Sequence, residues 1–342
     1  MIKYNNIINR FKGKKILVVG DLILDHYVKG SVSRISPEAP VPIVLQDESF
    51  YTPGGSANVA NNLSSLGAQV LIVGKVGHDL EGGLLKRELK KRKIAIDGVF
   101  TVVGSQTIVK TRIIAQHQQV VRVDREKTSD DGQDALIDSK IWPFVEKRIK
   151  ESHAIIISDY GKGMINPSFV SKIAQLANKK GIPITVDPKL DRFKLYGKVT
   201  SITPNKKEAE AALSRIPEDI RETMGAGVTK LNSQDDLLKA GKVFLEYLDI
   251  ESILVTLGEQ GMCLFEKGKD PFRIATKAQE VFDVSGAGDT VISVFTLALA
   301  AGATKRQAAD IANYAAGIVV GKMGAVAITK SELLDAIKEQ RT

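Results

Sequence analysis

The sequence predicts an α/β fold with a central, mostly parallel sheet flanked by helices. Two observations lead to this prediction: short apolar runs alternate with helical patterns, and several of these runs consist almost wholly of β-branched residues. Such continuous apolar runs are typical of strands that helices cover on both faces. The expected strands are Ile16–Val19, Val70–Val73, Ala154–Ser158, Ile182–Val186, Ser201–Thr203 and Ile253–Leu257.

Helical patterns lie between these runs. The first begins at Ser56, a residue type that caps helix N-termini, and it ends at Gly67. Thr304 and Gln307 have the spacing of a capping box and predict another helix start. The stretch Val291–Ala301 is too apolar to face water, so we expect a buried helix there.

Two regions interrupt this alternation of strands and helices. Residues 31–52 contain three prolines and then the extended-looking run Ile43–Leu45, while residues 105–127 contain two segments of alternating polar and apolar residues. Alternation predicts strands with one wet and one dry face. We expect both regions to form a small β-sheet lid that closes over a ligand. Because the apolar face of such a lid needs cover, we also expect a homodimer through the lid.

The composition narrows the possible functions. The chain has 342 residues, a formal net charge of +8, one cysteine and four histidines without metal-ligand spacing. No apolar run approaches the ~20 residues of a membrane span, and the N-terminus lacks the apolar core of a signal peptide, which predicts a cytoplasmic location. The positive charges are spread along the chain, so they favour anionic metabolites over nucleic acid as partners. Cys263 lies in an apolar run and is expected to be a core thiol.

The most informative segment is Asp283-Val284-Ser285-Gly286-Ala287-Gly288-Asp289, directly before the predicted buried helix. Small residues leave backbone N–H groups bare at a helix N-terminus, where phosphate oxygens bind. Asp289 would repel that phosphate, so it needs a role, and the simplest is to take the proton from a hydroxyl that attacks a phosphoryl group. The alternative is a plain strand-to-helix turn with Asp289 as an acidic first-turn residue.

A second glycine-rich segment, Gly54-Gly55-Ser56-Ala57-Asn58, precedes the first predicted helix. Paired glycines allow the backbone to approach a ligand closely, and the Asn58 amide offers a donor and an acceptor to polyol hydroxyls. Asp21 and Asp25 follow the first strand, where α/β proteins place ligands. A tight turn and a capping carboxylate are the respective structural alternatives.

Asn205 and Glu208 follow another predicted strand. Their oxygen atoms are suited to hold the waters of Mg²⁺ near a phosphate, with helix capping by Asn205 as the alternative. Thr256, Gly258 and Gly261 lie at the end of the last predicted strand and are suited to line a nucleotide pocket, although glycine turns also occur without ligands.

Together these segments resemble the ribokinase-like (PfkB) family of carbohydrate kinases over essentially the whole chain, as one kinase domain of residues 1–342. Both glycine-rich segments are similar to the two signatures of that family, in the same order. The resemblance implies a kinase that uses ATP and Mg²⁺, with Asp289 as the catalytic base. It also implies that backbone amides of Gly286, Ala287 and Gly288 form the anion hole for the transferred phosphoryl group.

The resemblance implies further contacts with the sugar, the nucleotide and metal ions. These are Asp25, Gly54, Gly55 and Asn58 for the sugar; Lys189, Asn205, Thr256, Gly258, Gly261 and Asn313 for the nucleotide; Asn205 and Glu208 for Mg²⁺ through water; and carbonyls around Asp283 and Ser285 for a monovalent cation such as K⁺.

One branch of the family is most similar. Gly20–Tyr27, Ser33–Pro42, Val121–Asp124 and Ser158–Gly163 resemble the branch that phosphorylates D-glycero-D-manno-heptose 7-phosphate at its anomeric hydroxyl, on the way to ADP-activated heptose for surface glycans. Ribokinases differ, since they carry Asn where this chain has Ile23. A kinase of another sugar or sugar phosphate, such as fructose 1-phosphate or 6-phosphate, and a non-catalytic sugar-phosphate sensor remain as alternatives.

The phosphate that such a substrate already carries needs cationic partners. Lys110, Arg112 and Arg122 on the expected lid strands are the candidates, with solvated strand residues as the alternative, and Arg34 and Lys162 are further candidates. In many bacteria this kinase is fused to an adenylyltransferase domain with an H-x-G-H motif. The sequence lacks that motif, so the resemblance implies a stand-alone kinase.

Overall fold

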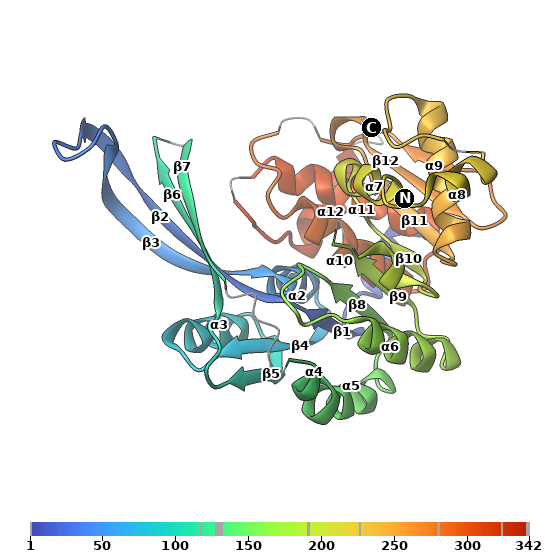
Figure 1. Cartoon of the computed structure of the whole chain (residues 1–342), viewed down its shortest axis with the longest axis horizontal. Coiled ribbons are helices and arrows are strands. Elements are labelled where there is room, and N and C mark those ends of the chain that lie inside the picture. The colour runs from blue at the N-terminus through green and yellow to red at the C-terminus, as the bar shows by residue number, and fades with distance from the viewer. Residues whose placement is uncertain are drawn as a thin grey trace.

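The main body of the molecule is a twisted β-sheet with helices on both faces (Figure 1). Its strand order is β13-β12-β11-β10-β9-β8-β1-β4-β5. The pairings from β11 to β5 are parallel, whereas β12 and β13 extend the sheet in antiparallel fashion. The computed structural model describes residues 2–116, 118–126, 133–189, 192–225, 227–278, 281–322 and 324–339.

The strands of the main sheet are short and mostly buried. The central strands β1 and β8 are rich in Ile, Leu and Val and are buried between helices, which explains their largely apolar sequences. The strands are β1 (Lys15–Gly20), β4 (Gln69–Gly77), β5 (Ala95–Val102), β8 (Ala154–Ser158), β9 (Ile184–Asp187), β10 (Ser201–Ile202), β11 (Ser252–Thr256), β12 (Met262–Glu266) and β13 (Phe272–Ile274).

The helices cover the sheet with two separate apolar cores, one on each face. On one face lie α1 (Ile2–Asn9), α2 (Ser56–Ser65), α3 (Leu80–Lys91), α10 (Ala287–Ala300), α11 (Lys305–Val320) and α12 (Lys330–Glu339). The other core includes residues of the π-helix η1 (Ile137–Ile141), α5 (Trp142–Ile149), α6 (Pro167–Lys179), α7 (Lys206–Leu213) and α9 (Gln234–Tyr247). The remaining helical segments are α4 (Gln133–Leu136), η2 (Phe193–Tyr196), α8 (Glu218–Thr223) and η3 (Gly258–Gln260).

The six predicted strands are all present, as β1, β4, β8, β9, β10 and β11. The bounds of β8 agree with the prediction, whereas β9 begins at Ile184 rather than Ile182. Three strands were not predicted. β5 is half-exposed and interrupted by Asp97 and Gly98, and β13 has only three residues. β12 is the apolar run around Cys263, which was assigned to the core but not to a strand.

A second, four-stranded sheet projects from the main body, and we call it the lid sheet (Figure 1). Its order is β3-β2-β6-β7, with β2 and β6 parallel and the two outer pairs antiparallel. The predicted strands in both lid regions are present, but the hairpin is longer than expected because β2 starts directly after β1. Residues 117 and 127 of the predicted lid lie outside the described residues. The strands are β2 (Leu22–Ile35), β3 (Pro42–Gly55), β6 (Ile108–Ala115) and β7 (Gln118–Arg125).

Of the two predicted helix caps, one is present and the other is not. Thr304 and Gln307 form the expected capping box at α11, and α10 is the expected buried helix. The N-cap prediction at Ser56 is wrong, because Gly55 occupies the cap position of α2. The Ser56 hydroxyl instead donates to the Asp21 carbonyl oxygen at 2.6 Å. A tertiary contact has therefore replaced the local cap.

Candidate active site

A cavity of about 240 Å³ lies at the carboxyl end of the parallel strands, beside the N-terminus of α10, and we call it the active-site cavity. Parallel sheets place ligands at this end. The cavity brings together the predicted catalytic turn with four of the predicted nucleotide and metal residues. Its lining residues are Asp159, Tyr160, Asp187, Pro188, Lys189, Thr203, Asn205, Glu208, Thr256, Gly286, Gly288 and Asp289.

The turn before α10 has the geometry that its glycines allow. Gly286 precedes the helix with φ at 79°, a left-handed conformation that glycine adopts without strain. A Cβ atom there would come 3.0 Å from Asn58 Nδ2, so the missing side chain also leaves room for Asn58. The Ala287 N–H donates to the Val284 carbonyl oxygen at 3.2 Å and closes the turn. Gly286 and Gly288 line the active-site cavity directly.

Asp289 is held from two sides. Asn58 Nδ2 donates to its Oδ2 atom at 2.7 Å, and the Tyr160 hydroxyl donates to its Oδ1 atom at 2.8 Å. The side chain belongs to a residue that is only 7% exposed. Burial raises the pKa of Asp289 from 3.8 to about 6, although the two hydrogen bonds lower it. A buried, oriented carboxylate with a pKa near neutrality is suited to accept a proton.

Asp21 organises the loop that carries Tyr160. Its Oδ2 atom accepts the backbone N–H groups of Tyr160 and Lys162 at 2.9 and 3.0 Å, and its Oδ1 atom accepts that of Met164 at 3.1 Å. Burial raises the pKa of Asp21, while these hydrogen bonds lower it. The structure thus favours the capping alternative for Asp21 over a sugar contact.

Asn205 and Glu208 form a capping box at the start of α7. Asn205 Oδ1 accepts the Glu208 N–H at 3.0 Å, and Glu208 Oε2 accepts the Asn205 N–H at 2.8 Å. The capping alternative is therefore present, and both residues line the active-site cavity as well. Burial raises the pKa of Glu208, and burial together with the negative charges of Asp289 and Glu208 raises the pKa of Asp187 well above its usual value. This side of the cavity is rich in carboxylate oxygen atoms.

The other predicted nucleotide residues are spread over three places. Lys189 and Thr256 line the active-site cavity. Gly258 and Gly261 lie in the turn between β11 and β12, outside that lining. Asn313 is buried in α11, where its Nδ2 atom donates to the Ala275 carbonyl oxygen at 2.6 Å. The roles of these residues stay predictions.

The lid sheet has one charged face. Asp25 on β2 is in register with Lys110 on β6, and Lys110 is in register with Asp124 on β7. Residues in register across strands point to the same side of a sheet, as do residues two apart along a strand. Arg112 and Arg122 therefore share this face with them. Four of the residues predicted to bind the substrate lie on this one face.

Asp25 and Arg112 form an ion pair at the base of the lid sheet. Arg112 Nη1 lies 2.6 Å from Asp25 Oδ1, and both side chains are largely buried. Gly54 packs against the same carboxylate, since a Cβ atom there would come 2.5 Å from Asp25 Oδ2. Gly55 follows and forms the N-cap of α2. The predicted sugar contacts Asp25, Gly54, Gly55 and Asn58 are thus neighbours in sequence or space.

The candidate phosphate-binding cations differ in their surroundings. Lys110 Nζ lies 5.6 Å from the ring centroid of Tyr160, and burial lowers the pKa of this lysine. Arg122 makes two hydrogen bonds to Asp124, at 2.8 and 2.9 Å, on the exposed strand β7. Lys162 pairs with Glu126 at 2.7 Å. Arg34 is exposed on the outer part of β2. Lys110 and Arg112 are therefore the candidates with the closest contacts to Tyr160 and Asp25.

The predicted cation site near Asp283 and Ser285 has a loop-forming carboxylate. Asp283 Oδ1 accepts the Ser285 N–H at 2.8 Å, and Oδ2 accepts the Gly324 N–H at 3.0 Å. These bonds tie the segment before α10 to the segment after α11. The binding of K⁺ here stays a prediction.

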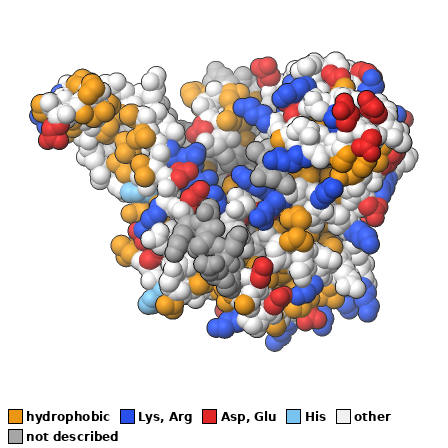
Figure 2. Space-filling view, viewed as in Figure 1, with side chains coloured by type: hydrophobic (Ala, Val, Ile, Leu, Met, Phe, Trp, Pro, Cys, Tyr) orange, Lys and Arg blue, Asp and Glu red, His pale blue; other side chains and the backbone are white. Residues whose placement is uncertain are grey.

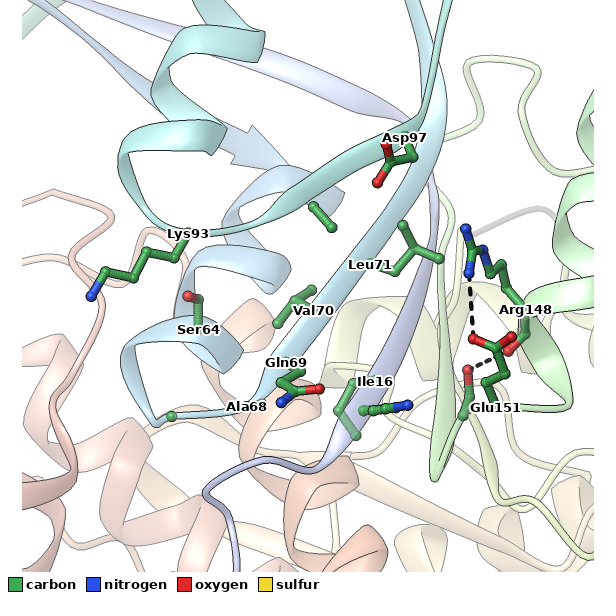
Figure 3. A pocket seen from close by; sticks show the side chains of 14 residues that line it. Ile16, Ser64, Ala68, Gln69, Val70, Leu71, Lys93, Asp97, Arg148 and Glu151 are labelled. Carbon is green, nitrogen blue, oxygen red and sulfur yellow. Dashed lines mark hydrogen bonds and ion pairs between the residues drawn. The ribbon is translucent and has the colours of Figure 1, made fainter.

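A larger cavity of about 570 Å³ lies at the opposite end of the sheet, around the amino ends of β1, β4 and β5 (Figure 3). Ile16, Val70 and Leu71 form its apolar wall, and Arg148 pairs with Glu151 at its side. Its lining contains none of the residues predicted to bind or act on a substrate. The smaller active-site cavity is therefore the candidate site for the chemistry.

Figure 2 shows a hollow between the lid sheet and the main body, with Lys and Arg side chains and some Asp and Glu side chains beside it. No helix in the described part of the chain combines the length and the apolar character needed to cross a membrane.

The sequence predictions missed five residues that line the active-site cavity: Asp159, Tyr160, Asp187, Pro188 and Thr203. Two of them, Asp187 and Tyr160, interact with Asp289. Asp187 is the last residue of β9, and its position directly after the predicted strand Ile182–Val186 was the available signal. Tyr160 lies in Ser158–Gly163, a segment singled out for its resemblance but without an assigned role. Its contact with Asp289 joins residues that are 129 positions apart, which no local pattern reveals.

A buried carboxylate at a glycine-rich helix start, beneath a projecting lid sheet, is the arrangement of a sugar kinase. Residues 14–332 match the pfkB family of carbohydrate kinases, and the chain belongs to this family. The predicted family and enzyme class are thereby confirmed.

The relatives agree with this membership. The chain is 41% identical to the bifunctional protein HldE of Desulfatibacillum aliphaticivorans over 97% of its own length and 65% of the relative. It is 40% identical to the HldE of a Haemophilus influenzae strain over 96% of its length and 64% of that protein. The chain thus spans slightly less than two thirds of the length of these relatives.

Solved structures support the fold. A ribokinase from Arabidopsis thaliana complexed with ribose and ATP has a TM-score of 0.72 and 19% identity, covering 96% of this chain and 99% of that one. Phosphofructokinase-2 from Escherichia coli in complex with potassium has a TM-score of 0.73 and 18% identity, covering 96% and 100%. The predicted ribokinase-like fold with its lid sheet is confirmed.

Proposed function

We propose that this chain transfers a phosphoryl group from ATP to the anomeric hydroxyl of D-glycero-D-manno-heptose 7-phosphate and produces heptose 1,7-bisphosphate. The observation that carries the proposal is Asp289, a buried carboxylate held by two hydrogen bonds at the glycine-rich start of α10. The choice of heptose rests on the resemblance of Gly20–Tyr27 and Ser33–Pro42 to one kinase branch, together with identities near 40% to HldE proteins.

Asp289 would act as the general base. The acceptor hydroxyl gives its proton to the carboxylate while its oxygen bonds to the γ-phosphorus, and the bond between that phosphorus and the β–γ bridging oxygen breaks to release ADP. We assign the anion hole for the transferred group to the backbone amides of Gly286, Ala287 and Gly288. Gly286 and Gly288 line the cavity, whereas the Ala287 N–H donates to the Val284 carbonyl oxygen. General-base assistance of this kind contributes about 10²–10⁴-fold to a rate.

The carboxylates opposite Asp289 fit a hydrated Mg²⁺ ion. Burial raises the pKa values of Asp187 and Glu208, and neighbouring negative charges raise that of Asp187 further, so a divalent cation would relieve the repulsion at Asp187. Mg²⁺ prefers such oxygen ligands and retains waters. Within the described residues no group of three or more His, Cys, Asp or Glu side chains is arranged to hold a metal ion. We therefore assign Glu208 and Asn205 to contacts through water.

One lysine lines the side of the cavity that we assign to the nucleotide. Lys189 lines the cavity beside Asp187, where an ammonium group can neutralise ATP phosphate oxygens. We assign the nucleoside part of ATP to residues that lie between the end of β11 and α11. These are Thr256, Gly258, Gly261 and Asn313. ATP supplies the phosphoryl group when bound, and K⁺ near Asp283 would adjust the anion-binding turn.

The phosphate of the sugar is assigned to the charged face of the lid sheet. Arg112 uses one N–H group on Asp25 at 2.6 Å, and its planar guanidinium has further donors for phosphate oxygens. Lys110 stands next to it in the same strand. This arrangement lets Asp25 accept sugar hydroxyls while the neighbouring cations hold the phosphate.

The opposite face of the lid sheet supports a homodimer. Val121 and Val123 on β7 are 45% and 55% exposed, and Ile35 at the end of β2 is exposed as well. Large apolar side chains gathered on a projecting sheet favour burial against a second copy. We propose a dimer through this face, in the cytoplasm, where ATP is available.

An acceptor panel tests the proposed function. ADP release would be measured with both anomers of heptose 7-phosphate, with fructose 1-phosphate, fructose 6-phosphate and ribose, each with ATP and Mg²⁺. We expect the highest kcat/KM with heptose 7-phosphate. A faster reaction with a fructose phosphate would make the chain a kinase of that sugar phosphate. Tight sugar-phosphate binding without ADP release from any acceptor would identify a non-catalytic sensor.

A further inference from the structure

Tyr160 touches the proposed base and has no role in the function described so far. Its hydroxyl donates to Asp289 Oδ1 at 2.8 Å, while Asn58 occupies Oδ2. Each carboxylate oxygen has two acceptor positions, so one on each oxygen is used by these bonds. The carboxylate cannot rotate without breaking a bond to one of the two donors.

The backbone of Tyr160 is fixed independently of the lid sheet. Its N–H donates to the buried Asp21 carboxylate at 2.9 Å, and the following loop is held by the same carboxylate at Lys162 and Met164. Asp21 itself follows β1 in the centre of the main sheet. The position of the tyrosine ring is therefore set by the most buried part of the fold.

The protonation state of Tyr160 is also fixed. Burial raises the pKa of its phenol well above 10, and the neighbouring charges of Asp289 and Asp187 raise it further. The phenol consequently keeps its proton over the working range of an enzyme. It is a permanent donor to Asp289 and cannot compete with it as a base.

The lid sheet reaches Tyr160 from the other side. Lys110 Nζ on β6 lies 5.6 Å from the centroid of the tyrosine ring, within the range of a cation–π contact. The charged and polar groups around Asp289 are thus Asn58 on α2, Asp25 on β2, Lys110 on β6, Tyr160 after β8 and Asp187 at the end of β9.

We propose that Tyr160 is a positioning residue that orients the Asp289 carboxylate for proton abstraction, and that Lys110 connects this tyrosine to the lid sheet. The inference rests on the proposed function in so far as Asp289 is the base. It adds that the Tyr160 hydroxyl aligns the Asp289 carboxylate. It also adds that the lid sheet contacts Tyr160 through the Lys110 ammonium group.

The first test compares Tyr160→Phe with Tyr247→Phe. The Tyr247 hydroxyl on α9 is buried without a hydrogen-bond partner in the described part of the structure, so its removal is a matched control. We expect kcat of Tyr160→Phe to fall about 10- to 100-fold, the scale of a hydrogen bond to a charged group, and KM values for ATP and sugar phosphate to change less than about threefold. Tyr247→Phe should stay within about twofold of the parent.

The pH profile separates positioning from a merely structural role. Since the Tyr160 hydrogen bond lowers the pKa of Asp289, its loss should move the acid limb of kcat to higher pH. A kcat within twofold of the parent, or an unchanged acid limb, would overturn the proposal. Melting temperatures of both variants check that the fold is intact.

A double-mutant cycle tests the link to the lid sheet. Lys110→Met and Tyr160→Phe should lower kcat by less in combination than the product of their single effects, because both act on the same carboxylate. Multiplicative effects would remove Lys110 from the proposal.

A readout without turnover keeps this inference separate from the proposed function. The Asp289 carboxylate would be titrated by ¹³C NMR in protein labelled at aspartate, with Asp289→Asn to assign the signal. We expect a higher pKa in Tyr160→Phe than in the parent, whichever sugar the enzyme phosphorylates. Equal titration midpoints would contradict the positioning role even if the acceptor panel succeeds, and a failed panel would leave this result standing.

Discussion

The main sheet and the lid sheet hold their charged residues in opposite ways. At the carboxyl end of the main sheet, Asp21 and Asp289 are buried and each accepts several hydrogen bonds. On the outer lid strand, Arg122 and Asp124 are largely exposed and bond chiefly to each other. The contrast suggests a division of work, in which the main sheet positions the chemistry and the lid sheet selects the substrate.

Asp25 lies at the boundary between the two regions. It belongs to a lid strand, yet it is buried against Gly54 and paired with Arg112. Lys110 also lies at this boundary, because it belongs to a lid strand and its Nζ atom contacts the ring of Tyr160. Substitutions on either side of this boundary should therefore have distinguishable effects on turnover and on substrate recognition.

The largest expected effect is on the main-sheet side. Asp289→Asn removes the base, and kcat should fall at least ~10²-fold while ATP binding stays within a few-fold of the parent. The fold tolerates the change because Asn58 can turn its amide: its Oδ1 atom has no hydrogen-bond partner in the described structure and can accept from Asn at 289. Single-turnover phosphoryl transfer and calorimetry with an ATP analogue would measure the two quantities. Near-normal turnover would exclude Asp289 as the base.

The next largest effect is expected at Arg112, which lies at the boundary between the lid sheet and the main sheet. Arg112→Met should lower kcat/KM for the sugar phosphate about 10- to 100-fold, since a hydrogen bond to a charged group is lost. The same variant should affect an unphosphorylated sugar much less. Arg122→Met should have a smaller effect, because that guanidinium is exposed and already bonded twice to Asp124. Equal losses with both kinds of sugar would show that Arg112 does not read the phosphate.

The pKa of Asp289 predicts a pH dependence of both activity and stability. Because the folded-state pKa is about 6 and the ordinary value is 3.8, the folded chain keeps this proton to higher pH than the unfolded chain does. Its contribution to the free energy of unfolding therefore falls as pH rises from about 4 to about 6 and stays low above that range.

Two measurements check the direction of this pH dependence. In the parent, kcat should decrease as pH falls below about 6, because the base becomes protonated. Asp289→Asn should be more stable than the parent by about 2–3 kcal/mol at pH 8, with the difference reduced toward pH 4. Asp97→Asn, at an exposed aspartate of β5, is the control and should show no such trend. A stability difference that grows toward acid pH would contradict the argument.

The smallest effect on turnover is expected on the outer face of the lid sheet. Val121→Lys with Val123→Lys places two charges on the proposed dimer face and should shift the mass at micromolar concentration from dimer to monomer. Val103→Lys alters an equally apolar residue that is 84% exposed outside the lid sheet, and should leave the mass unchanged. Light scattering measures both, and a monomeric parent would contradict the dimer.

Local patterns predicted much of the main sheet and the lid. Apolar runs marked the parallel strands, alternation marked strands of the lid sheet, and glycines marked the turn before Asp289. These signals work because strand burial and turn geometry depend on neighbouring residues. The Ser56 cap failed for the opposite reason, since its hydroxyl bonds to Asp21, 35 positions earlier.

Local sequence patterns could not predict the contacts between side chains within the candidate site. Asp25 meets Arg112 across 87 positions, and Asn58 meets Asp289 across 231. These pairs depend on how strands and helices are ordered in the sheets. The sequence resemblance placed several of these residues in one site, but the partners that orient Asp289 and engage Arg112 emerged only with the fold.

The identity of the product tests the proposed function most directly. The parent enzyme would be incubated with ATP, Mg²⁺ and heptose 7-phosphate, and the product examined by ³¹P NMR. We expect a bisphosphate with one signal from the original phosphate and a second from a phosphate on the anomeric carbon, formed together with ADP. A new phosphate on another hydroxyl, or no new sugar phosphate while ATP persists, would contradict it.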